Sequence, residues 1–205
     1  MQLSHTSPSA RRNPAMTRDR LMAAAFAEMY HAGYQGSDLN SIIVKAGVTK
    51  GALYHHFAGK EALGHAVIEQ AIGKVMTDKW LAPLDDIDDP IPALIGIIES
   101  TSLSDPDVAG GCPLNNLAQE MSPLDEGFRM RLSAIFQGWI GGIADALRLG
   151  QANGKVRPGI DVRDTATFIV ATYEGYISLA KNAQDATMLR AGVRQLTQYL
   201  LGLRP

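Results

Sequence analysis

The side chains best placed to do specific chemistry lie in the run KGALYHHF, at residues 50–57. If this run is helical, Leu53 and Phe57 point inward together. The opposite face then presents Lys50, Gly51, Tyr54 and His55. Lysine and histidine supply hydrogen-bond donors, and such a face can enter the major groove of DNA and contact base edges. The pattern therefore predicts a short helix that reads DNA.

A second short helix is expected directly upstream, over residues 39–46. Asp38 can cap its first turn, and Gly47 tolerates the left-handed backbone that ends it. Thr49 can cap the helix that follows. Any helical hairpin with a glycine corner shares this spacing, so the hairpin alone leaves DNA binding and plain packing both open.

The surrounding sequence predicts two more helices. The first spans residues 18–32 and carries one apolar stripe, formed by Leu21, Ala24, Ala25 and Met29. It ends at a corner formed by Gly33 and Tyr34. Residues 60–79 form a longer helical pattern, whose expected inward residues are Ala62, Val67, Ile68, Ala71, Ile72 and Val75. This long helix would join the hairpin to the rest of the chain.

Four features follow one another in order in the amino-terminal part of the chain: the first helix, the Gly-aromatic corner, the run VTKGALYHHF and the run GKEAL. Together they resemble the amino-terminal DNA-binding domain of the TetR family of dimeric, ligand-responsive transcriptional repressors. The resemblance runs without a break over about residues 17–64. Two positions depart from the family pattern. Glu28 stands where the first helix usually carries an apolar residue, and Ile43 stands where a small alanine is usual. Both departures bear on packing more than on DNA readout.

The resemblance implies two sets of DNA contacts. Residues that would face bases are Asn40, Lys50, Gly51, Ala52 and His55. Residues that would grip phosphates are Thr49, Tyr54, His56 and Lys60. The adjacent His55 and His56 could suggest a metal, but neighbouring helical residues diverge by about 100° and no third ligand lies at metal spacing. The sequence therefore predicts no metal site and no cofactor.

Composition favours an all-α chain. The 205 residues are dominated by aliphatic and small helix formers, and alternating β-branched runs are rare. We expect a disordered arm at residues 1–15, a three-helix DNA-binding head with the helix-turn-helix at 16–60, and a helical body of about six helices at 61–205. No apolar run is long enough for a transmembrane helix, and the amino terminus lacks the apolar core of a secretory signal, so the cytoplasm is expected.

Charge is distributed unevenly along the chain. Residues 1–60 carry a net charge of +4, and residues 61–205 carry −6. A basic head would attract phosphates and an acidic body would keep DNA off other surfaces, although chance scatter of surface charge is an alternative. Arg11 and Arg12 could enter a minor groove from the arm, or the arm could be a solvated tail.

The body is expected to enclose an effector pocket, as the resemblance implies. Its helices are predicted over residues 91–103, from Pro113, over 124–152, from Asp161 to about Lys181, and over 186–201. The candidate pocket residues are Cys112, Asn116, Phe128, Phe136, Trp139, Tyr173 and Tyr176. Aromatic residues at helical spacing also occur as plain core, which is the alternative.

Cys112 allows two interpretations. Pro113 suits a first helical position, so Cys112 falls at the N-cap, where exposed N–H dipoles favour a thiolate. The Gly-Cys-Pro-Leu-x-Asn-Leu-Ala element also resembles one found in a subset of TetR-type regulators, some of which sense electrophiles or oxidants through cysteine. The simpler interpretation is a small, buried and inert thiol with no disulfide partner in the chain.

The last two predicted helices carry the residues expected at a dimer interface, which are Ala171, Gly175, Leu189, Val193, Leu196 and Leu200. Two helices alone cannot bury both of their stripes. The family implies a four-helix interface with a second copy of the chain, and the alternative is that these helices fold back on their own body.

Other classes of protein fit the sequence less well. Ser178 and Lys181 match the S-x-x-K pattern of certain serine acyl-transfer enzymes, but no partner motif accompanies them and the all-helical pattern is wrong for those folds. A helical interaction module without DNA binding is a further alternative. The favoured interpretation is a homodimeric regulator of double-stranded operator DNA, with a near-palindromic site and release by a small-molecule effector.

Overall fold

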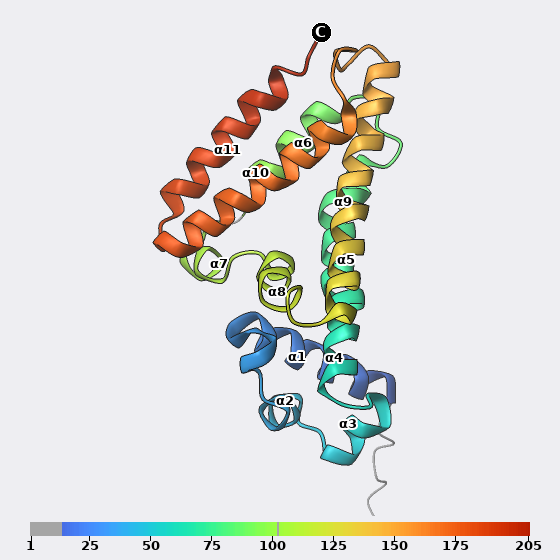
Figure 1. Cartoon of the computed structure of the whole chain (residues 1–205), viewed down its shortest axis with the longest axis vertical. Coiled ribbons are helices and arrows are strands. Elements are labelled where there is room, and N and C mark those ends of the chain that lie inside the picture. The colour runs from blue at the N-terminus through green and yellow to red at the C-terminus, as the bar shows by residue number, and fades with distance from the viewer. Residues whose placement is uncertain (1–13, 102) are drawn as a thin grey trace, which may run out of the picture.

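The computed structural model of the chain describes residues 14–101 and 103–205. Its first three helices are α1 (Pro14–Gly36), α2 (Leu39–Ala46) and α3 (Lys50–His56), which form the predicted three-helix head at one end of the molecule (Figure 1). α1 starts four residues before the predicted helix and two before the expected boundary of the head, because Pro14 suits the first helical turn. Arg11, Arg12 and the rest of the expected arm up to residue 13 lie outside the described residues.

A single helical rod, here called the linking helix, runs over residues 60–81. It consists of α4 (Lys60–Ala66), the π-helical η1 (Val67–Ile72), α5 (Gly73–Met76) and the π-helical η2 (Thr77–Leu81). The backbone N–H of Gly73 donates to the carbonyl of Ile68, which is the wider hydrogen-bond spacing of a π-helix. This wider turn shifts the inward face: Met76 and Trp80 are buried, whereas Val75, predicted to point inward, is 48% exposed.

The body follows after the short η3 (Ala82–Leu84). Its helices are α6 (Pro90–Glu99), α7 (Asp105–Gly110), α8 (Pro113–Met121), α9 (Glu126–Ala152), α10 (Val162–Ala183) and α11 (Ala186–Leu201). These helices confirm the all-α body, with no strand in the part of the chain that is described. Two expectations were wrong: α6 stops at Glu99, and α7 occupies a segment expected to be a loop. None of the described helices is long and apolar enough to cross a membrane.

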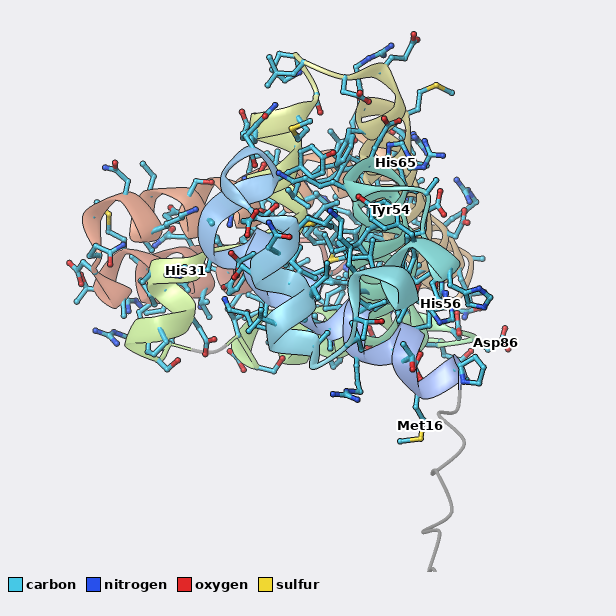
Figure 2. The ribbon with its side chains drawn as sticks, turned by 90° about the horizontal axis from the view of Figure 1, so that it is seen from below. Met16, His31, Tyr54, His56, His65 and Asp86 are labelled. Atoms are coloured by element: carbon cyan, nitrogen blue, oxygen red, sulfur yellow. The ribbon has the colours of Figure 1, made fainter. Side chains whose placement is uncertain are left out.

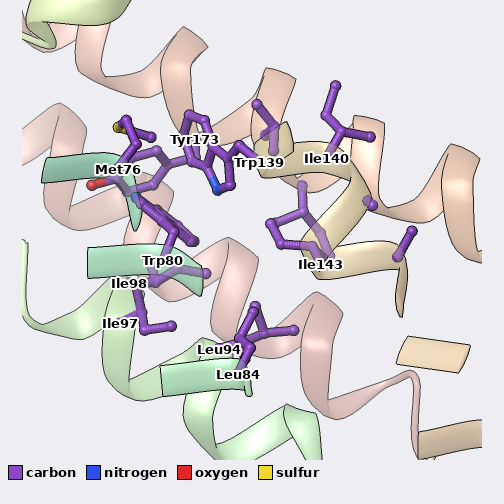
Figure 3. Close-up of a cluster of buried hydrophobic side chains, with 14 of the residues drawn as sticks. Met76, Trp80, Leu84, Leu94, Ile97, Ile98, Trp139, Ile140, Ile143 and Tyr173 are labelled. Atoms are coloured by element: carbon purple, nitrogen blue, oxygen red, sulfur yellow. The ribbon is translucent and has the colours of Figure 1, made fainter. Parts of the chain in front are cut away.

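The linking helix contributes to two separate hydrophobic cores. Leu63 and Val67 are fully buried in the head core, with Leu21, Ala25, Ile42 and Leu53 of α1 to α3. Ile68 and Ile72 belong instead to the body core, which also holds Trp80, Trp139, Ile143 and Tyr173 (Figure 3). The same helix packs along α9 in the body (Figure 1). Head and body are therefore joined by a shared structural element rather than by a loop.

The apolar stripe of α11 faces the inside of its own subunit. Leu189, Leu196 and Leu200 are between 0% and 4% exposed, because α11 packs on both α6 and α10. Val193 is half-buried against the body core. These four residues are therefore core positions, which corrects their assignment to a dimer interface. Away from their buried stripes, the two helices expose a different apolar set, namely Phe168 and Leu179 on α10 and Met188 and Leu201 on α11, together with Ala171 and Gly175 of α10.

Candidate nucleic-acid interface and body cavity

Local capping fixes the hairpin formed by α2 and α3. The Asp38 carboxylate accepts a hydrogen bond from the Ser41 N–H at 2.8 Å, and the Thr49 hydroxyl accepts one from the Ala52 N–H at 3.2 Å. Between the helices, Gly47 adopts a φ of 60°, a left-handed conformation that glycine takes without steric cost. Arg20 of α1 donates to the Gly47 carbonyl at 3.2 Å, so α1 holds this turn in place.

α3 buries one face and leaves the other open to solvent. Leu53 and Phe57 are at most 5% exposed, in the head core. The opposite face exposes Lys50, Gly51, Tyr54 and His55, as predicted, and the adjacent Asn40 and Thr49 are exposed as well. No atom lies within 4 Å of a Cβ built on Gly51, so another molecule can approach the backbone there. Figure 2 views the molecule from the head end, where Tyr54 and His56 are labelled.

The four predicted phosphate contacts differ in their surroundings. Thr49 caps α3 and is also exposed to solvent. Tyr54 is 48% exposed, and His56 is half-buried. Lys60 is half-buried too: its ammonium donates to the Gln35 carbonyl at 3.3 Å and lies 4.8 Å from the centre of the Tyr34 ring. Lys60 thus already binds the end of α1, a structural contact that the sequence did not predict.

The departure from the family pattern at Glu28 has a structural explanation. The Glu28 carboxylate forms an ion pair with the Lys45 ammonium, which joins α1 to α2. The hydrogen bond from Lys45 is the main reason why the pKa of Glu28 lies below its ordinary value. A charged residue is therefore tolerated at this position because its partner lies on the neighbouring helix.

Glu120 of α8 connects the body to the head. Its two carboxylate oxygens accept hydrogen bonds from the backbone N–H groups of Tyr34 and Gln35, at 2.8 and 2.7 Å. These N–H groups follow Gly33, where α1 bends with a φ of 74°. A Cβ on Gly33 would lie 2.7 Å from a Glu120 oxygen, so only glycine permits this close approach.

Further contacts reinforce the same junction. The Tyr30 hydroxyl of α1 donates to the Gly111 carbonyl at 2.9 Å, just before α8. The Tyr34 and Phe128 rings meet with centroids 4.4 Å apart, and Phe128 belongs to α9. An open cavity of about 450 Å³ lies beside these contacts, between α1, α8 and the end of α10. α8 and α9 are therefore both in direct contact with α1.

A second, smaller cavity of about 180 Å³ lies inside the body. Its walls come from the linking helix, α7, α8, α9 and α10, and include Trp80, Trp139, Tyr173 and Glu174. The Trp80 and Trp139 rings are 4.6 Å apart between centroids, and Tyr173 meets Trp80 edge to face at 4.9 Å (Figure 3). The cavity thus has an aromatic cluster on one wall, and residues of the linking helix line it directly.

Two family models match this chain. The model described as bacterial regulatory proteins of the tetR family matches residues 21–67, and the tetracyclin repressor-like C-terminal domain model matches residues 89–196, more than half of the chain. The chain belongs to the TetR family. It is a helix-turn-helix transcriptional regulator with a ligand-binding carboxy-terminal domain.

Known TetR-family proteins are similar over most of the chain. The HTH-type transcriptional repressor DhaR of Mycobacterium sp. strain GP1 is 28% identical over 152 residues, which cover 71% of this chain and 72% of DhaR. The transcriptional regulator AcuR of Cereibacter sphaeroides is 28% identical over 88% of this chain and 89% of its own length. A TetR regulator from Chloroflexus aurantiacus J-10-FL has a solved structure that superimposes with a TM-score of 0.81 at 28% identity, over 93% and 96% of the two chains.

The predicted pocket residues do not all lie in one place. Cys112, Trp139 and Tyr173 line the 180 Å³ cavity. The other four lie elsewhere: Asn116 at the head–body junction, Phe128 in the core against Tyr34, Phe136 in a shallow depression beside α10, and Tyr176 against Gly192 of α11. The seven residues therefore do not form one pocket, which corrects the prediction. The reason is that α8 and α9 each line more than one cavity or depression.

Ser178 and Lys181 hold two helices together. The Asn115 amide donates to the Ser178 hydroxyl at 3.0 Å, and the Lys181 ammonium donates to the Asn116 side-chain oxygen at 2.8 Å. Both bonds tie α8 to α10. The S-x-x-K spacing therefore places these residues in structural contacts rather than together at a nucleophilic centre.

Among the cavity residues that the sequence did not predict, Lys79, Trp80 and Glu174 matter most for its chemistry. The inward positions of α10 are Ile169, Val170, Tyr173 and Ile177, and Glu174 lies on the same stripe at helical spacing. An acidic residue within an otherwise apolar stripe was the available signal. Lys79 and Trp80 could not be placed from an α-helical period, because the π-helical turns shift the inward face.

Cys112 is the N-cap of α8, as predicted, but its surroundings disfavour a thiolate. Burial raises the pKa of the Cys112 thiol well above its ordinary value, and the neighbouring Glu174 carboxyl raises it further. The expected effect of the helix N-terminus is thus outweighed by desolvation.

We therefore expect electrophiles to leave DNA binding unchanged, both in the native protein and in Cys112→Ser. Electrophiles such as N-ethylmaleimide should modify Cys112 far more slowly than a free thiol, because little thiolate is present. The measurements are the alkylation rate by mass spectrometry and gel shift before and after treatment. Electrophile-driven release of the native protein, lost in the serine variant, would contradict this expectation.

Proposed function

We propose that this chain represses transcription as a homodimer that places two α3 helices in successive major grooves of a near-palindromic operator. The observation that carries the proposal is the exposed α3 face with Lys50 and His55, opposite the buried Leu53 and Phe57 that fix the helix in the head. Two such heads would have to lie about 34–36 Å apart to match one helical turn of DNA. Lys50 and His55 would contact base edges, while Thr49, Tyr54 and His56 would contact phosphates.

The outer face of α10 and α11 supplies the proposed dimer interface. Phe168, Ala171, Gly175 and Leu179 follow one another at helical spacing on α10 and are all exposed. Phe168 and Leu179 expose 48% and 54% of their surface, although large apolar side chains are usually covered. Apart from α10 itself, no atom of the described residues lies within 4 Å of a Cβ built on Gly175, which leaves room for a helix of a second copy. Ala171 and Gly175 therefore remain proposed interface residues.

Release would begin in the body cavity. A ligand in contact with Trp80 and Trp139 would move the linking helix relative to α9, and the head would move with it because Leu63 and Val67 belong to the head core. The ligand must bind the spread state more tightly than the DNA-bound state for release to follow. Such a regulator would act in the cytoplasm, where the operator is accessible.

A gel shift with the DNA upstream of the gene tests DNA binding directly. Retardation should be sequence-specific and should weaken steeply as salt rises, because phosphate contacts release counterions. The control is DNA of unrelated sequence at the same salt. Absence of retardation at every ionic strength would exclude the repressor function and favour a helical interaction module.

Glu120→Ala should weaken communication between cavity and head. The variant removes two charge-assisted hydrogen bonds to α1 but leaves the 180 Å³ cavity intact. With an effector found by thermal-shift screening, we expect unchanged effector affinity and about a tenfold smaller effect of the effector on operator affinity. Gln119→Ala, at the exposed neighbouring position, is the matched control. Equal release in both variants would show that the Glu120 contact carries no coupling.

A further inference from the structure

The 180 Å³ cavity contains polar groups that the protein leaves unsatisfied. Glu174 is only 6% exposed, and within the described part of the chain neither of its carboxylate oxygens accepts a hydrogen bond of normal geometry, although the Cys112 thiol lies close enough to lower its pKa in part. The indole N–H of Trp139, which lines the same cavity, also lacks an acceptor there. A buried polar group without a partner is costly, so native proteins rarely keep one without a reason. Both groups belong to residues that line the cavity, so a molecule bound there could supply their missing partners after a small shift of the surrounding side chains.

The charges around the cavity favour a cationic partner. Three charged side chains line it: Lys79, Asp107 and Glu174. The Lys79 ammonium is already engaged, because it donates to the Tyr173 hydroxyl at 3.0 Å and lies 5.9 Å from the centre of the Trp80 ring. With Glu174 ionised, the lining carries one net negative charge. The faces of Trp80, Trp139 and Tyr173 provide additional attraction for a positive group.

The size of the cavity limits the rest of the molecule. Apolar cavities of about 150 Å³ accept a benzene ring, so a volume of about 180 Å³ accommodates one ring with a short substituent. The apolar walls, from Ile72, Met76, Ile177 and Leu189, favour a ring without further charged groups.

We propose that the body cavity binds a compact amine, with a single apolar ring against the tryptophans and a protonated nitrogen that donates to Glu174. The inference rests on the proposed function in one respect, because it names the chemical class of the effector. An ammonium group supplies up to three hydrogen-bond donors and a positive charge. It therefore provides both the hydrogen bonds and the counter-charge that the Glu174 carboxylate lacks. A neutral alcohol would supply one donor and no charge, and a carboxylate would be repelled by Glu174.

Intrinsic fluorescence gives a direct measurement, because the chain contains two tryptophans and both line this cavity. The full-length protein is titrated at pH 8 with three non-fluorescent probes of one shape: cyclohexylmethylamine, cyclohexylmethanol and cyclohexanecarboxylate. We expect the amine to change the emission and to bind at least about tenfold more tightly than either other probe. Comparable or tighter binding of the alcohol or the carboxylate would overturn the proposal, and so would unchanged emission with all three.

A variant then tests the assigned acceptor. Glu174→Gln keeps the shape of the side chain and removes its charge, so the preference for the amine over the alcohol should fall to about twofold or less. Glu126→Gln is the matched control, since Glu126 is exposed at the start of α9 and should leave the preference unchanged. An undiminished preference in Glu174→Gln would overturn the assignment. The probe series on the native protein remains decisive if this variant fails to fold.

Operator binding separates this inference from the proposed function. Amine binding that depends on Glu174 but leaves operator affinity unchanged would support the cavity chemistry and contradict the effector mechanism. Operator release by some other compound, without any amine preference, would support the effector mechanism and overturn the cavity chemistry.

Discussion

Replacing Lys50 with alanine should weaken operator binding by roughly 10- to 100-fold for each half-site, because a good lysine contact to guanine contributes about 1–3 kcal/mol. Lys50 is the first residue of α3 and is exposed. Its ammonium lies 6.0 Å from the centre of the Tyr54 ring, on the open face of the helix. The measurement is fluorescence anisotropy with the operator and with single-base variants of each half-site.

The pattern of losses distinguishes base reading from phosphate binding. If Lys50 reads a base, discrimination should disappear at one position per half-site in Lys50→Ala. Tyr54→Phe should instead weaken all operator variants about equally, because a phosphate contact carries no sequence information. Lys155→Ala, an exposed lysine after α9, is the control for the loss of one positive charge. A uniform loss in Lys50→Ala would assign Lys50 to a phosphate.

Glu174→Gln should stabilise the ligand-free protein at pH 8 by roughly 3 kcal/mol and have little effect below pH 4.5. Burial raises the pKa of the Glu174 carboxyl more than the Cys112 thiol and the Lys79 ammonium lower it, so the pKa rises from an ordinary value of 4.5 to about 7. Between pH 4.5 and pH 7, Glu174 is therefore more fully protonated in the folded protein than in the unfolded chain. The free energy of unfolding therefore falls as pH rises towards 7, and the glutamine variant avoids that loss.

The comparison of native and variant protein isolates Glu174 from other titrating groups. Lys79, Asp107 and Cys112 face the same cavity and are present in both proteins. Thermal unfolding should give a midpoint about 6–12 °C higher for the variant at pH 8, and a small difference at pH 4.5. Glu126→Gln should show no such dependence. An equal gain at both pH values would indicate better packing rather than relief of a buried charge.

Local signals explain why the head was predictable from the sequence. Asp38, Gly47 and Thr49 mark the ends of α2 and α3 through their own side chains or backbone. The bounds of α11 were also correct, since Asp185 caps it and its apolar stripe has a regular period. In each of these elements the decisive interaction lies within a few residues along the chain.

The body was harder to predict because its sites depend on contacts between distant segments. An amphipathic stripe shows that a face is covered but does not show by what. Leu196 and Leu200 are covered by α6 and α10 rather than by a second subunit. Glu174 could be recognised as a cavity residue only once Trp80 and Trp139 were placed beside it. The π-helical turns that bring Trp80 there leave no clear mark in the sequence.

Those π-helical turns also affect how operator geometry can evolve. A π turn holds more residues than an α turn, so η1 and η2 act like short insertions absorbed within an unbroken helix. Loss of one residue from Val67–Ile72 would restore an α turn and rotate everything beyond it by about 100°. A loop would absorb such a deletion without reorienting the head. If two heads bind DNA as proposed, a change in the length of the linking helix would therefore alter the half-site spacing while every residue proposed to contact DNA stays the same.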